Sequence, residues 1–211
     1  MFSFYKTAFS SKTQKIPPDA VAMYVMKTAG DYNATIAEMT SLILSEFPNN
    51  IRFRNRAVDE GQWLSMACGL IALVWLEKGP PRDVPPVVGV TVKMGELYSL
   101  IDIENNGKTP FKPEFVDRMM TKLTFYVSLY FDKLYERGDT LDKFSFQDAA
   151  TEVARKMLEF SAIEGNGTNP DANAMSGPGR AADALLFWLA AMVTERIGYY
   201  VQALGKYEIA A

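Results

Sequence analysis

Apolar residues return at helical spacing over most of this chain, and that pattern predicts an all-α fold. The clearest segment is 113–137, whose stripe consists of Val116, Met120, Leu123, Val127, Tyr130 and Leu134. Segment 179–204 repeats the spacing with Leu186, Ala190, Val193, Ile197, Tyr200 and Leu204. Wide apolar stripes of this kind are typical of helices that face the core of a bundle.

A third segment, 61–78, is apolar around its whole circumference between Trp63 and Leu76, so we expect it to lie centrally in the bundle. The polar residues 49–60 are interpreted as its opening turns. The uncharged run from Gly61 to Leu76 is shorter than the roughly 20 residues that a bilayer span needs, and no transmembrane segment is expected.

Near the N-terminus, the pattern predicts two helices rather than one. Pro17-Pro18-Asp19 opens the first, over Pro18–Ala29, because proline and an acid suit the first turn of a helix. Gly30 and Asp31 are expected to break it. A second helix would follow from about Asn33 to Phe47, where Pro48 ends it.

The remaining elements are shorter. Gly79-Pro80-Pro81 stops the central helix, and the β-branched run Val87–Val92 predicts at most one minor strand, so 79–92 is a possible internal boundary. A short helix is expected over Gly95–Ile103. Gly138 should close helix 113–137, and Ser145 with Asp148 three residues later has the pattern of a capping box.

Together these elements predict a single irregular bundle of about six or seven helices over residues 17–211. Residues 1–16 lack the apolar core of a secretory signal and are expected to form a flexible N-terminal arm. We expect a cytoplasmic protein, with an organelle or bacterial secretion address in this Ser-rich, acid-free arm as the alternative.

Composition excludes several kinds of chemistry. The 211 residues include no histidine and one cysteine, Cys68, so a Ser-His-Asp triad, a Cys-His dyad and an intrachain disulfide are impossible. Cys68 lies in the most apolar helix and is interpreted as an inert core thiol. The net charge of −3 argues against general, charge-driven nucleic-acid binding. No cofactor is expected.

The first candidate binding residues are Arg52, Arg54 and Arg56, which flank Phe53 in the only dense basic cluster. Arginines in this arrangement can hold a phosphate or carboxylate through paired hydrogen bonds. In a helix, residues two apart do not share a face, so the three would point apart. Acidic residues follow the cluster directly in the sequence, which favours its interpretation as an ordinary solvent-exposed face.

The second candidate site is the Gly/Asn/Pro-rich loop 164–179, since loops of this length are usually functional or disordered. It offers oxygen atoms from Asn166, Asn169, Asp171 and Asn173. Calcium sites use such groups, but the ligand order of the EF-hand is missing and the charge is low, so no metal is expected.

Three classes of function remain open. The first is a protein-interaction module such as an adaptor, secreted effector or inhibitor, which acts by binding another protein or by self-association. The second is a helical enzyme or small-ligand-binding protein that uses Arg, Tyr or carboxylate groups. The third is a DNA-binding regulator with a helix-turn-helix at 21–47, although its second helix would carry Glu38 and no basic residue. We expect binding rather than catalysis.

Overall fold

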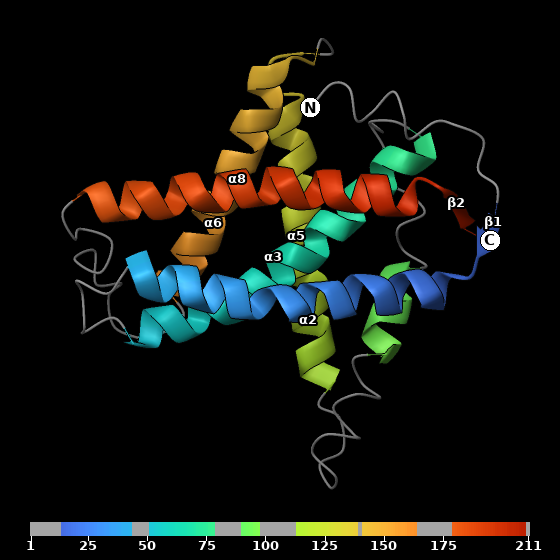
Figure 1. The fold of residues 1–211 in the computed structure, drawn as a ribbon, viewed down its shortest axis with the longest axis horizontal. Coiled ribbons are helices and arrows are strands. Elements are labelled where there is room, and N and C mark those ends of the chain that lie inside the picture. Colours follow the sequence, from blue (N-terminus) through green and yellow to red (C-terminus); the bar gives the residue numbers. More distant parts are fainter. Residues whose placement is uncertain are drawn as a thin grey trace, which may run out of the picture. The chain divides into compact units, whose positions relative to one another are not determined.

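The computed structural model describes residues 14–43, 51–78, 90–97, 113–138, 141–163 and 179–209 (Figure 1). The main helices in these ranges are α2 (Pro18–Ile43), α3 (Ile51–Lys78), α5 (Pro113–Leu134), α6 (Lys143–Ile163) and α8 (Gly179–Leu204). A short helix spans 90–97. Strands β1 (Gln14–Ile16) and β2 (Tyr207–Ile209) are the other regular elements there. The predicted all-α class is confirmed.

The prediction of two N-terminal helices is wrong, because α2 continues through Gly30 and Asp31 without a break. A glycine inside a helix costs only about 1 kcal/mol, which the packing of an in-phase apolar face outweighs. Buried Val25, Ala29 and Ile36 carry that face across the glycine. Without a turn at Gly30, the helix-turn-helix expected at 21–47 does not form.

The minor strand expected at Val87–Val92 is also contradicted where the chain is described. Val90, Thr91 and Val92 form the first turn of helix 90–97, and 87–89 lie outside the described residues. Val90 and Met94, one helical turn apart, are both buried. Packing of that face overrides the β-preference of branched residues, which is weaker than tertiary context.

The chain divides into two compact units, and the divisions fall within helices. The first unit comprises 1–28, 66–127 and 196–211, and the second comprises 29–65 and 128–195. The domain boundaries predicted from the sequence, at residue 17 and near 79–92, stay predictions.

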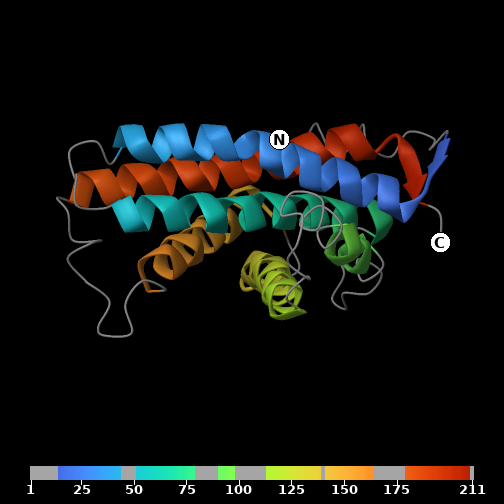
Figure 2. The ribbon, with the colours of Figure 1, turned by 90° about the horizontal axis from the view of Figure 1, so that it is seen from below.

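The first unit brings the two ends of the described chain together. β1 and β2 pair in parallel, with Gln14 opposite Tyr207 and Ile16 opposite Ile209 (Figure 2). An exposed ion pair joins Lys15 to Glu208 at 3.6 Å. The end of the expected N-terminal arm is therefore a strand, whereas 1–13 lie outside the described residues.

In the same unit, α2 and α3 approach closely at Gly69. A Cβ atom on Gly69 would meet the two methyl carbons of Val25 at 2.7 and 3.0 Å. Because real Cβ atoms do not approach neighbours this closely, only glycine permits the observed packing. The sequence therefore sets the distance between these two helical segments through one missing side chain.

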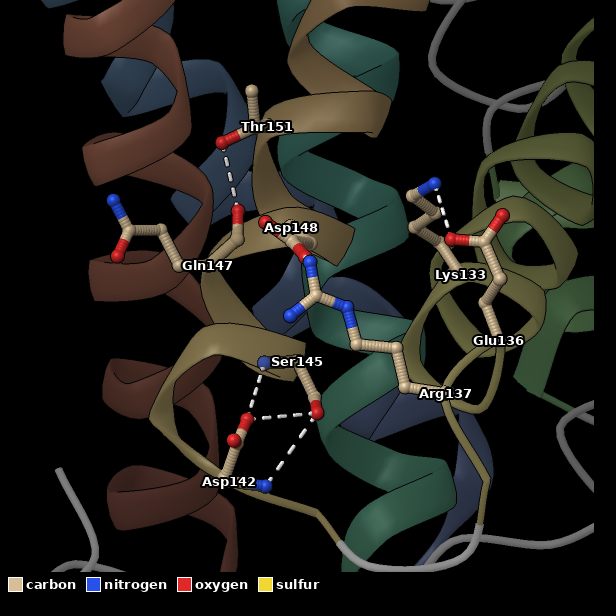
Figure 3. Close-up of polar contacts among 8 residues, drawn as sticks. All are labelled: Lys133, Glu136, Arg137, Asp142, Ser145, Gln147, Asp148 and Thr151. Carbon is tan, nitrogen blue, oxygen red and sulfur yellow. Dashed lines mark hydrogen bonds and ion pairs between the residues drawn. The ribbon is translucent and has the colours of Figure 1, made fainter.

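In the second unit, polar contacts form at the end of α5 and at the start of α6 (Figure 3). Gly138, at φ +102°, adopts the left-handed conformation that commonly ends a helix. Ser145 donates its backbone N–H to Asp142 Oδ1 at 2.8 Å, so Asp142 caps α6. The cap of α6 thus lies three residues before Ser145, the position at which the sequence predicted it. Asp148 instead pairs with Arg137 at 2.6 Å.

The predicted core helices are confirmed by their burial. α3 is buried on every side from Trp63 to Leu76, as its all-round apolar pattern indicates. On α5, the buried residues are Met119, Leu123, Tyr126, Val127, Tyr130, Phe131 and Leu134. α8 begins and ends where the sequence predicts, and its buried face includes Leu189, Val193, Ile197 and Tyr200.

Candidate functional site

The predicted arginine cluster lies in the first two turns of α3. Its backbone is helical rather than extended. The extended conformation that would align all three arginines is therefore not adopted by this segment. The side chains of 51–59 lie outside the described residues.

The second predicted site, Asn166, Asn169, Asp171 and Asn173, lies outside the described residues. Within the ranges that are described, no group of three or more Cys, Asp or Glu side chains could hold a metal ion. The candidate sites must therefore be sought on the described helices.

One such feature is the exposed side of α8 in the second unit, which we call the α8 strip: Ala184, Phe187, Trp188 and Ala191. Phe187 is 73% exposed, more than any other large apolar side chain described. Ala184 and Ala191 are exposed on either side of it, and Trp188 is half-buried. No charged residue occurs from 184 to 194, so the water-facing surface here is apolar.

Acidic side chains stand at both ends of the α8 strip. Asp183 precedes it and Glu195 follows it, and both are exposed. Twelve residues of helix place their backbones about 18 Å apart along the axis. Each end of the apolar strip thus carries an acidic side chain, with Arg180 and Arg196 as the nearest basic residues in sequence.

A second feature, in the first unit, is a cluster of tyrosines from α2 and α8. The Tyr24 hydroxyl donates a hydrogen bond to the Tyr199 hydroxyl at 2.9 Å, across 175 residues of sequence. Tyr200 is completely buried beneath them and donates its hydroxyl to the Val25 carbonyl at 3.3 Å. Its ring meets those of Tyr24 and Tyr199 edge-on, at centroid distances of 6.2 and 5.7 Å.

Electrostatics keep the Tyr24 hydroxyl protonated. Desolvation raises its pKa to about 12, and the hydrogen bond to Tyr199 adds to the shift. The guanidinium of Arg196 lies 5.6 Å from the centre of the Tyr199 ring, a cation–π arrangement. At neutral pH Tyr24 is therefore a hydrogen-bond donor.

Cys68 is the only thiol of the chain and is completely buried in α3. Desolvation raises the pKa of its thiol to about 12, so almost none is present as the reactive thiolate at neutral pH. The interpretation of Cys68 as a core residue agrees with this burial.

Sequence reasoning missed both features. The sequence does indicate the α8 strip, since α8 is apolar on two neighbouring faces. The second apolar face was interpreted as part of the core. No sequence pattern indicates the Tyr24–Tyr199 pair, because residues this far apart in sequence come together only through tertiary packing.

By length and composition alone, Asp183–Leu204 of α8 is the one described helix that could cross a membrane. In its most apolar window, 44% of the residues are buried inside the protein. Core helices pass the same test. The strip's acidic ends are also unfavourable next to the anionic surface of a cytoplasmic leaflet.

Comparisons with protein-family models, curated proteins and solved structures found no match to this chain.

Proposed function

We propose that this protein is an interaction module whose α8 strip binds an amphipathic helix of another protein, one with basic residues at both ends of its apolar face. The observation that carries the proposal is the exposure of Phe187 in the middle of an uncharged, apolar run. Contiguous apolar surface of this kind often marks an interaction site. An apolar helix face is a common partner for such a surface.

Charge favours a different protein over a second copy of this chain. If two α8 strips packed antiparallel, Asp183 of each copy would face Glu195 of the other. A parallel arrangement would bring Asp183 to Asp183 and Glu195 to Glu195. Both orientations oppose like charges, which is unfavourable. Lysine or arginine at the ends of the partner's apolar face would instead complement both acids.

Binding can be tested with two synthetic helical peptides that share one leucine face, one flanked by lysine and the other by glutamate. Fluorescence anisotropy should show that the lysine-flanked peptide binds more tightly. Burying a phenylalanine contributes about 1.5–3 kcal/mol, so Phe187→Ala should weaken this binding by about 10- to 100-fold. The matched control is Phe144→Ala, which removes a phenylalanine that is 61% exposed at the start of α6.

A double charge reversal, Asp183→Lys with Glu195→Lys, should transfer the preference to the glutamate-flanked peptide. Equal binding of both peptides, or equal effects of Phe187→Ala and Phe144→Ala, would contradict the proposal. The proposal would also be contradicted if sedimentation analysis showed a dimer that Phe187→Ala dissociates, since the strip would then serve self-association.

A further inference from the structure

The tyrosine cluster of the first unit has a geometry that suits an oxidative modification. Tyr24 and Tyr199 come from α2 and α8 and meet hydroxyl to hydroxyl at 2.9 Å. Tyr199 is 44% exposed, so an oxidant in solution can reach its ring. Tyr200, by contrast, is completely buried and bonded to the Val25 carbonyl.

We propose that Tyr24 and Tyr199 form a site of intramolecular dityrosine cross-linking, with a haem peroxidase and hydrogen peroxide as the class of oxidant. The link is a carbon–carbon bond between the ring positions next to the two hydroxyl groups. In the product each hydroxyl is on the carbon next to the newly bonded carbon of its own ring, so the two hydroxyls lie side by side. The existing hydroxyl contact therefore already brings together the atoms that flank the new bond.

Each tyrosine loses one electron and its hydroxyl proton and becomes a phenoxyl radical. The two radicals couple through their ortho carbons, and the hydrogens on these carbons move through water to the oxygens, which restores both aromatic rings. In total two electrons and two protons leave the protein. They reduce one molecule of hydrogen peroxide to two molecules of water.

The surroundings favour coupling of this pair over reactions with other chains. The proton of Tyr199 can pass directly to water, since its ring is partly exposed. While Tyr199 alone is oxidised, the Tyr24 hydroxyl still donates a hydrogen bond to the phenoxyl oxygen of Tyr199, and this bond holds the two side chains together until Tyr24 loses its own electron and proton. Tyr200 packs edge-on against both rings.

The cross-link would join residues 175 apart in sequence and so tie α2 to α8 covalently. A link that closes a long loop restricts the unfolded chain, and stability rises mainly for that reason. The modified protein should accordingly unfold at a higher urea concentration than the unmodified protein. Oxidation would thus fasten the N- and C-terminal helices of this unit.

The test treats the full-length Cys68→Ala variant with a haem peroxidase and hydrogen peroxide, so that thiol oxidation does not confuse the mass assignment. We expect blue dityrosine fluorescence in a product that stays monomeric under denaturing electrophoresis. Its mass should fall by two hydrogen atoms, and peptide mapping should join the peptides of Tyr24 and Tyr199. Tyr24→Phe and Tyr199→Phe should each abolish the product.

The matched control is Tyr207→Phe, which removes a half-buried tyrosine of β2 in the same unit and should leave the yield unchanged. Circular dichroism establishes that each variant is folded before treatment. A linked monomer that persists in Tyr24→Phe would overturn the assignment. Fluorescence confined to covalent dimers would overturn it too, because Tyr199 would then react only between molecules.

Discussion

α3 and α8 have similarly apolar sequences, but they differ in how completely they are buried. Both have long apolar stretches that cover more than one helix face, and both were predicted to face the core. α3 is buried on every side from Trp63 to Leu76, whereas α8 leaves Phe187 exposed. An apolar face therefore predicts that much of a helix is buried, but not that every side chain on the face is covered.

The two helices also differ in how closely other side chains approach their glycines. α3 carries Gly61 and Gly69 at points where neighbouring side chains come closer than a Cβ atom would allow. α8 carries Phe187 and Trp188, and its Gly198 has open space around it. The glycines of α3 let side chains of neighbouring helices approach closely, whereas Phe187 of the α8 strip stays exposed.

The largest effect should come from probing the two helices with a thiol reagent. Cys68 is completely buried and its thiol has a pKa raised to about 12, so labelling should require unfolding. A cysteine placed in the α8 strip, as Phe187→Cys in a Cys68→Ala chain, should react at once. With a stability of about 5 kcal/mol or more, the rates should differ by at least about a thousandfold. Rapid labelling of native Cys68 would refute the central position of α3.

The next effect concerns the free energy of unfolding, measured with urea. Leu64→Ala in α3 removes a fully buried side chain and should destabilise the protein by about 2–5 kcal/mol. Phe187→Ala in α8 removes more atoms, yet the change should stay within about 0.5 kcal/mol because the ring is exposed. Similar losses for the two variants would show that the strip is covered in solution.

Glycine substitutions should give smaller changes of opposite sign. Gly69→Ala places a Cβ against the stiff side chain of Val25 and should destabilise by about 1–3 kcal/mol. Gly198→Ala meets no atom within 4 Å and should stabilise α8 by about 0.5–1 kcal/mol, since alanine favours helix. If Gly69→Ala were also stabilising, the close packing of α2 and α3 would be wrong.

The smallest effect on the free energy of unfolding is expected at the start of α6, where Asp142 caps the helix. Hydrogen bonds from Ser145 hold the pKa of Asp142 below its ordinary value of 3.8. The folded state thus binds this proton less readily than the unfolded state, so the stabilisation is present at neutral pH and is lost as the pH falls below 3.8.

Asp142→Asn keeps the capping oxygen and should remove this acid dependence, while Asp142→Ala should lose the cap as well. Urea unfolding at neutral and acidic pH separates the two variants. An unchanged pH profile in Asp142→Asn would show that other carboxyl groups cause the acid response.

Local sequence determined a large part of this fold. The spacing of apolar residues predicted α8 over its full length, placed α5 and α3, and located Cys68 in the interior. α5 ends at Leu134, three residues before the predicted end, and Gly138 closes the turn that follows, because its left-handed conformation depends on the residue itself. These features follow from interactions between residues close together in the chain, which the order of amino acids specifies directly.

Tertiary packing decided the rest. It carried α2 through Gly30, made Val90–Val92 helical, moved the α6 cap to Asp142, and paired β1 with β2. It also brought Tyr24 to Tyr199 and left Phe187 without cover. Each of these outcomes depends on which distant segments approach one another, and there the burial of a shared face outweighs local preferences of about 1 kcal/mol or less.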